Sequence, residues 1–160
     1  MRGNPEVIGL LNDVLTAEPT AEPTAGNQYF IHAKMCDNWG HARLAEYVRS
    51  ESIDEMRRAE QLIERNLYPD GLPNLQRLLP LNVGETVPEQ FDNDLQVEVV
   101  AIDRLNAGVA ACVAAGDNGA RALLEGIRTS EEEHADWLET QIEVIAQIGA
   151  PAYLAEQLHG

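Results

Sequence analysis

Glu131 and His134 are spaced so that both side chains lie on one face of a helix. A carboxylate and an imidazole are both ligands for transition metals. Such a pair is common by chance, so it predicts a metal site only weakly on its own. The hydrophobic residues of the same segment place the pair on the face turned toward a core, and these residues are Ile127, Leu138, Ile142 and Ile145.

Three other segments with helical periodicity each place one glutamate in a hydrophobic stripe. These glutamates are Glu98, Glu55 and Glu22. The apolar residues that frame them are Leu95 and Ile102, then Leu44, Val48 and Leu62, then Leu15 and Tyr29, respectively. The sequence therefore predicts one inward carboxylate on each of four helices.

Four carboxylates in one core are energetically unfavourable. A single buried carboxylate loses its hydration, and several together repel one another. They can become protonated, pair with cations, or bind metal. Metal binding is the reading we favour, because one or two divalent ions neutralise several carboxylates at once.

The segments that must position these residues read as helices. Short links join the first to the second and the third to the fourth, whereas about twenty residues separate the second from the third. This connectivity predicts an all-α, ferritin-like four-helix bundle with one long crossover, formed by residues 1–160 as a single domain. We expect helices over about Pro5–Asp37, His41–Asn66, Pro88–Ala115 and Ala120–Ile148, and a short fifth helix over Ala152–Leu158.

A tandem repeat interrupts the first helical pattern. Residues 17–20 read Ala-Glu-Pro-Thr, and residues 21–24 repeat them. Each proline removes a helical hydrogen bond and clashes with the preceding turn, at a cost of roughly 3 kcal/mol in a helix interior. We therefore expect a kink, bulge or interruption between about Ala17 and Ala25, which leaves the direction of Glu22 open.

The overall charge excludes some classes of partner. Acidic residues exceed basic ones by 27 to 11, which gives a net charge of −16. A basic surface for nucleic acid or anionic membrane is therefore not expected. Cys36 and Cys112 are too far apart in sequence to form a metal or redox motif, and no signal peptide or membrane span is apparent, so we expect a cytoplasmic protein.

Five motifs, in order along nearly the whole chain, resemble those of the bacterioferritins, a haem-containing ferritin-like family. They read Asn-Gln-Tyr-Phe-Ile-His-Ala at 27–33, Asp-Asn-Trp-Gly at 37–40, Glu-Ser-Ile-Asp-Glu-Met at 51–56, Asp-Gly-Leu-Pro-Asn-Leu-Gln at 70–76 and Glu-Glu-Glu-His-Ala-Asp-Trp-Leu-Glu at 131–139. The resemblance implies iron storage in a hollow shell of 24 subunits. It also implies a di-iron ferroxidase site, and haem b bound by one methionine from each of two subunits, which is Met56 here.

The ferroxidase ligands transfer by motif. The resemblance assigns Glu55 and Glu131 as bridging ligands, and Glu22, Glu98 and His134 as terminal ligands. The family has a second Glu-x-x-His on the second helix, but this chain has Arg58 at that position. Arginine stays charged and cannot bind iron, so its guanidinium is expected to pair with the carboxylates where one iron ion would lie.

Two functions follow from the resemblance and its exception. In the first, the chain oxidises Fe(II) and stores Fe(III). In the second, it is a structural, haem-carrying subunit with an impaired site, which assembles with a competent second subunit type, and its haem on Met56 passes electrons to the mineral. A redox partner is expected in either case. A rubrerythrin-type peroxidase is disfavoured, because two distant cysteines do not form a rubredoxin-like cluster.

We expect Tyr29 mainly to pack in the core, and His32, His41 and His159 to be surface or partly buried residues.

Overall fold

The computed structural model describes residues 5–67 and 79–158, with side chains from residues 21–65 and 79–158. This part of the chain is helical and contains no β-strand. His159, for which we predicted a surface position, lies outside it. The helices are α1 (Pro5–Asn38), α2 (Ala42–Leu67), α3 (Val87–Ala115), α4 (Asn118–Ile148) and α5 (Ala150–Ala155).

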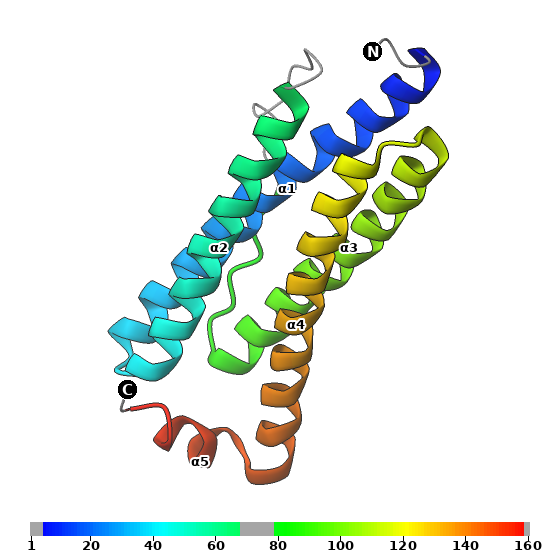
Figure 1. Cartoon of the computed structure of the whole chain (residues 1–160). Coiled ribbons are helices and arrows are strands. Elements are labelled where there is room, and N and C mark those ends of the chain that lie inside the picture. Colours follow the sequence, from blue (N-terminus) through cyan, green and yellow to red (C-terminus); the bar gives the residue numbers. More distant parts are fainter. Residues whose placement is uncertain (1–4, 68–78, 159–160) are drawn as a thin grey trace.

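The four long helices form two antiparallel hairpins that pack into a bundle (Figure 1). α1 packs along α2, α3 packs along α4, and α1 also contacts α3. The link between α2 and α3 is the long one, and α5 lies across the end of the bundle (Figure 1). The predicted ferritin-like fold is therefore confirmed, although α5 begins two residues earlier than expected.

Local sequence signals explain where α3 and α4 begin and end. Thr86 precedes α3, and its Oγ1 accepts a hydrogen bond from the N–H of Glu89. Gly116 ends the same helix with φ of +70°, a left-handed conformation that favours glycine. Asp117 then begins α4 by accepting a hydrogen bond from the N–H of Ala120 at 3.0 Å. These signals make the third-to-fourth connection short and hold the hairpin antiparallel.

The expected interruption of the first helix is wrong. α1 continues from Pro5 to Asn38 through both prolines of the repeat. Each proline removes one helical hydrogen bond, but the helix is continuous and packs along α2 and α3. Glu22 and Ala25, on either side of Pro23, are both buried. Tertiary packing therefore outweighs the local preference to break the helix.

The core is apolar toward each end of the bundle and polar in the middle. Toward one end, Leu62, Leu105 and Leu124 pack together, and Cys112 belongs to this cluster. Toward the other end the cluster consists of Cys36, Leu44, Ala45, Val87, Phe91, Leu138 and Tyr153. The two cysteines are free and lie in different clusters. Among the described helices, none is long and apolar enough to span a bilayer.

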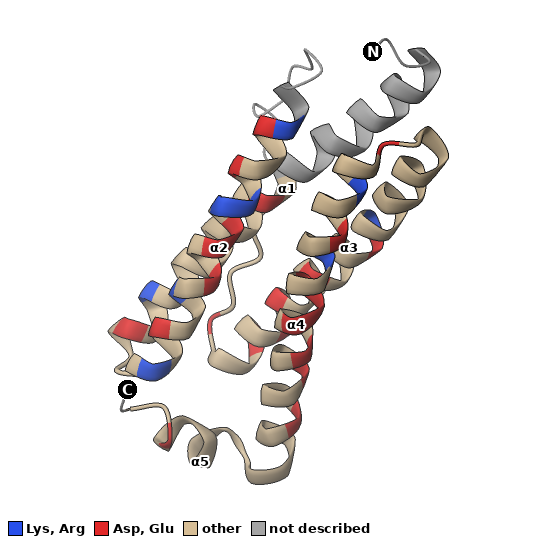
Figure 2. Cartoon of the chain, in the orientation of Figure 1, with Lys and Arg blue, Asp and Glu red and all other residues tan. Residues whose placement is uncertain are grey.

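Charged residues are unevenly distributed over the helices. Acidic positions recur along α2 and α4, whereas the basic positions are fewer and several lie on α2 (Figure 2). The middle level of the bundle is where acidic residues enter the core itself, and it is the level at which the candidate site lies.

Candidate metal centre

Each long helix contributes one buried glutamate to the middle of the bundle. Glu22 of α1, Glu55 of α2, Glu98 of α3 and Glu131 of α4 are at most 2% exposed. Their positions agree with the inward carboxylates predicted from the hydrophobic stripes. The unfavourable concentration of negative charge is therefore a real feature of the fold.

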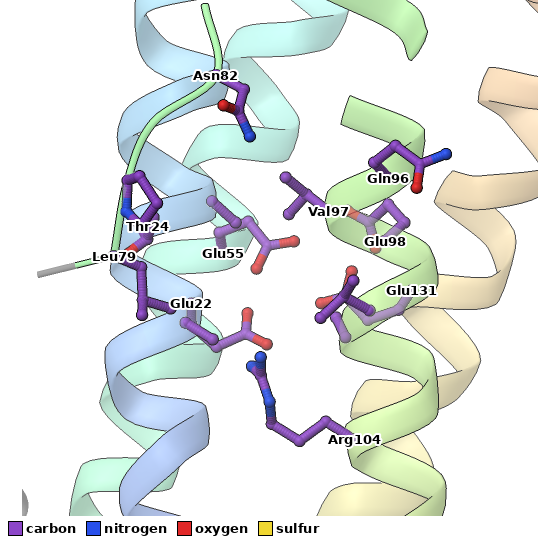
Figure 3. Close-up of a pocket in the computed structure, with 15 residues that line it drawn as sticks. Glu22, Thr24, Glu55, Leu79, Asn82, Gln96, Val97, Glu98, Arg104 and Glu131 are labelled. Atoms are coloured by element: carbon purple, nitrogen blue, oxygen red, sulfur yellow. The ribbon is translucent and has the colours of Figure 1, made fainter. Parts of the chain in front are cut away.

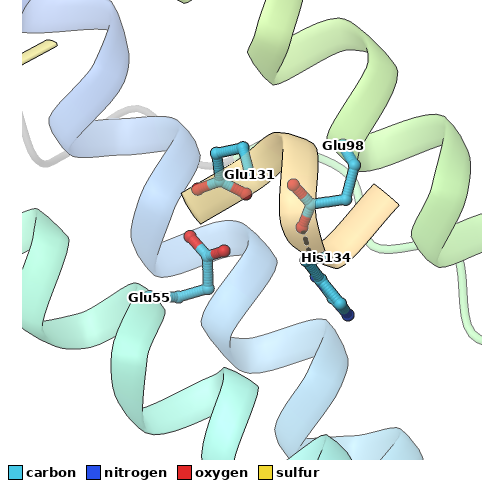
Figure 4. Close-up of side chains that lie close together, drawn as sticks. All are labelled: Glu55, Glu98, Glu131 and His134. Carbon is cyan, nitrogen blue, oxygen red and sulfur yellow. Dashed lines mark hydrogen bonds and ion pairs between the residues drawn. The ribbon is translucent and has the colours of Figure 1, made fainter. Parts of the chain in front are cut away.

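Glu55, Glu98, Glu131 and His134 converge on one point (Figure 4). One ligand atom from each lies within 4.8 Å of all the others. Nδ1 of His134 is 2.8 Å from Oε1 of Glu98. Metal–ligand bonds of about 2.0–2.2 Å place opposite ligand atoms about 4.0–4.4 Å apart. A small inward movement of these side chains would therefore enclose one metal ion.

Arg58 occupies the other side of the same cluster. Its Nη2 lies 2.6 Å from Oε1 of Glu55, and its Nε lies 3.1 Å from Oε1 of Glu131 and 3.5 Å from Oε2 of Glu22. The guanidinium thus contacts carboxylates from three helices, as the sequence predicted. Glu22 lies beside Arg58 and is not among the four residues that converge.

Comparison with known proteins agrees with this geometry. The model of the ferritin-like domain family matches residues 8–148. The chain is 48% identical to a bacterioferritin of Mycolicibacterium paratuberculosis over 156 residues, which are 98% of this chain and 96% of that protein. The chain belongs to the bacterioferritin family. It is also 49% identical to a bacterioferritin of Streptomyces coelicolor, with 97% and 90% of the two chains covered, and 47% identical to one of Mycobacterium tuberculosis, with 98% and 96% covered.

The electrostatics of this bacterioferritin-family centre follow from its burial. Loss of hydration is the main reason why the pKa of Glu98 rises to about 8. Burial, and then the neighbouring Glu98, raise the pKa of Glu131 to about 9. Burial also raises the pKa of Glu55 to about 7 and that of Glu22 well above its ordinary value. Without metal, the cluster therefore retains protons that an ordinary carboxylate loses.

Arg58 keeps its charge in this setting. Burial by itself lowers the pKa of the guanidinium, but the charges of Glu55, Glu131 and Glu22 raise it, and the resulting pKa lies above its ordinary value. The guanidinium is therefore a permanent cation in the centre. It partly compensates the carboxylates in the absence of metal.

Two residues near the metal ligands were not predicted as site residues. The hydroxyl of Tyr29 donates a hydrogen bond to Oε1 of Glu98, and its ring meets the imidazole of His134 edge-on at 5.2 Å between centroids. Tyr29 also packs in the core, so the expected packing role is only part of its function. Oε2 of Glu51 lies 3.6 Å from Nδ1 of His134, one helical turn before Glu55. The sequence signals for Glu51 were this spacing on α2 and its place at the start of the motif at 51–56.

A cavity of about 190 Å³ lies beside the centre, between α1, α3 and the end of the crossover. All four glutamates line it, and most of the other lining residues are aliphatic. Figure 3 shows Arg104 of α3 directing its guanidinium into the cavity toward the carboxylate of Glu22. Small ions or molecules in this cavity would therefore contact the carboxylates directly.

A second buried polar cluster holds the crossover against the bundle. Nε2 of Gln28 donates to Asp94 at 2.8 Å, and Nδ1 of His32 lies 2.9 Å from the same carboxylate. The N–H groups of Asn82 and Gly84 donate to Oε1 of Gln28 and Nε2 of His32. His32 is fully buried, so the expected surface or partly buried position is wrong. Its role is to bind the backbone of the chain that leads into α3.

Met56 is half exposed and lies against α1. Its side chain is 49% exposed, although it directly follows the buried Glu55. A Cβ atom at Gly26 would lie 3.1 Å from Sδ of Met56, so the glycine leaves room for the thioether beside α1. The side chain of Met56 thus lies half exposed at the surface formed by α1 and α2.

Proposed function

We propose that the chain is an iron-storage subunit that binds Fe(II) in the middle of its bundle and oxidises it. The supporting observation is the convergence of Glu55, Glu98, Glu131 and His134 at one buried point. Carboxylate oxygens and an imidazole nitrogen are suitable ligands for iron. The similarity to bacterioferritins over nearly the whole chain supports the same function.

In this proposal iron is the substrate and the cargo. Fe(II) reaches the carboxylates and loses one electron there. Two Fe(II) ions supply the two electrons that reduce one molecule of hydrogen peroxide, which takes up two protons and becomes two molecules of water. Dioxygen is the alternative electron acceptor. Glu98 and His134 act as terminal ligands, and Glu55 and Glu131 as ligands able to bridge. Glu22 completes the ligand set that the motifs imply. The net charge of −16 favours entry of the cation.

Storage requires an assembly, which we propose to be a homo-oligomeric shell of 24 subunits around an Fe(III) mineral. Haem b would be held by Met56 from each of two subunits and would supply electron transfer to the stored iron. Phe30 of α1 and Ile53 of α2 are exposed apolar side chains on the two helices that flank Met56, and they suit a subunit interface at this surface. A redox partner would deliver the electrons.

The test measures the rate of Fe(II) oxidation and the amount of iron that the purified protein retains after addition of Fe(II) in air. We expect Glu98→Gln and His134→Ala to reduce early Fe(II) oxidation by at least the roughly tenfold loss typical of changes around a metal ligand. Glu133→Gln is the matched control, because Glu133 is exposed on the same helix. Equal oxidation rates in all four proteins would disprove the proposed site.

The second candidate is a haem-carrying subunit that depends on a competent partner subunit for oxidation. The ion pairs of Arg58 with three of the glutamates favour it. The purified chain distinguishes the two functions. Iron oxidation and retention by this chain alone supports the first, whereas retention only after assembly with a second bacterioferritin subunit type supports the alternative.

A further inference from the structure

The guanidinium of Arg58 stands where carboxylates from three helices meet. It is 2.6 Å from Glu55, 3.1 Å from Glu131 and 3.5 Å from Glu22. A metal ion bound by these three carboxylates would have to lie between them, in the space that the guanidinium fills. The side chain of Arg58 is only 11% exposed, so it is enclosed in this position.

The opposite side of the cluster has ligand atoms without such a partner. Oε2 of Glu98 and Oε2 of Glu131 accept no hydrogen bond from any donor in the described part of the chain. Both residues are at least 99% buried, and both belong to the group that converges with Glu55 and His134. Buried carboxylate oxygens without a donor are costly unless a cation binds them.

Charge balance separates one bound ion from two. Four carboxylates, one guanidinium and one divalent ion leave a single negative charge, which one proton neutralises. A second divalent ion would instead have to lie directly beside the fixed positive charge of Arg58, which repels it. Arg104 also directs its guanidinium toward Glu22 (Figure 3), which adds positive charge on the same side.

From these contacts we infer that the centre holds one divalent cation per chain, among Glu98, Glu131 and His134 with Glu55, and that Arg58 replaces a second ion. The inference rests on the proposed iron site and specifies its capacity. A bound ion and a guanidinium then share Glu55 and Glu131 as common partners.

Zinc tests the number of sites without any redox reaction. Crystals of the wild-type protein soaked in Zn(II) would be measured above and below the zinc absorption edge. We expect one anomalous peak at bonding distance from Glu98, Glu131 and His134, and none between Glu22 and Arg58. Arg58→His should show a second peak, because an imidazole replaces the cation with a ligand. Arg57→His, at an exposed neighbouring position, should show one peak in the centre, like the wild type.

Solution calorimetry gives an independent count of the Zn(II) sites, as the difference in the number of bound ions between Arg58→His and the wild type, which we expect to be one per chain. Two peaks in the wild-type centre would overturn the inference and leave the proposed function intact. No peak there would disprove the proposed iron site itself. If Arg58→His does not fold, the wild-type map alone decides between one and two ions.

Discussion

The hydroxyl of Tyr29 donates a hydrogen bond to Oε1 of Glu98, the same oxygen that lies 2.8 Å from Nδ1 of His134. One carboxylate oxygen thus connects a tyrosine on α1 with a histidine on α4. Such outer contacts orient metal ligands and adjust their affinity. Tyr29 is therefore a positioning residue for the metal centre.

Tyr29→Phe should weaken Zn(II) binding by about tenfold while the fold persists, because the ring still packs but the donor is lost. Calorimetry of the metal-free protein measures this change. Tyr153→Phe is the matched control, since its hydroxyl bonds Gln141 far from the centre. Unchanged zinc affinity in Tyr29→Phe would show that the hydrogen bond does not position Glu98.

Removal of Arg58 should destabilise the metal-free protein. Arg58→Met leaves Glu22, Glu55 and Glu131 without their common cation, and loss of one partner from a buried ion pair costs about 3–5 kcal/mol. The loss should be larger at pH 9 than at pH 6, because protonation relieves the repulsion at the lower pH. Thermal unfolding at both pH values measures it.

Arg57→Met provides the comparison for this experiment, because the side chain of Arg57 is exposed and, within the described part of the chain, pairs only with Asp54. Its unfolding temperature should match that of the wild type. An Arg58→Met protein as stable as Arg57→Met at pH 9 would mean that the ion pairs of Arg58 contribute nothing net.

The stability of the metal-free protein should decrease as the pH rises from about 5 to 9. The pKa of Glu98 is about 8 and that of Glu131 about 9 in the folded chain, and both are higher than in the unfolded chain. Between the ordinary pKa of a glutamate in the unfolded chain and these raised pKa values, the folded state binds more protons than the unfolded state. The free energy of unfolding therefore falls as the pH increases through this range. Thermal unfolding across this range measures the slope.

Glu98→Gln combined with Glu131→Gln should flatten this pH dependence, since the amides do not titrate. Zn(II) should reverse it, because metal displaces the protons and binds more tightly as the pH rises. A metal-free wild type whose stability increases from pH 5 to 9 would contradict the assigned pKa directions.

Met56 offers a test of the haem proposal that is independent of the iron centre. Met56→Leu keeps an apolar side chain of similar size but removes the sulfur ligand. We expect the purified variant to lose the haem absorption bands and to retain Zn(II) binding in its centre. Met35→Leu is the control methionine, since Met35 lies elsewhere on α1 and contacts Gln90. Full haem content in Met56→Leu would assign the axial ligand to another residue.

Patterns local in sequence account for much of the fold and for the inward glutamates. The period of the helix fixes which positions of α2, α3 and α4 turn inward, so Glu55, Glu98 and Glu131 could be identified from their apolar neighbours. Thr86 and Gly116 mark helix ends for equally local reasons. The long crossover followed from the lengths of the links alone.

Contacts between distant segments explain what the sequence missed. Tyr29 and Glu98 are 69 residues apart, and Gln28 and Asp94 are 66 apart, so no spacing rule connects them. The burial of His32 likewise depends on Gly84 in the crossover. The continuity of α1 through Pro19 and Pro23 depends on packing partners, which a local propensity cannot include.

The unbroken course of α1 through its tandem Ala-Glu-Pro-Thr segment makes the two copies interchangeable. Excision of residues 17–20 would leave a glutamate five residues before Asn27, with the same neighbours on its C-terminal side. Everything toward the N-terminus would shift by four residues, which is about 6 Å along the axis and 40° around it. Gain or loss of one copy would thus spare the glutamate and alter only how far the helix projects beyond it and which way that projecting part faces.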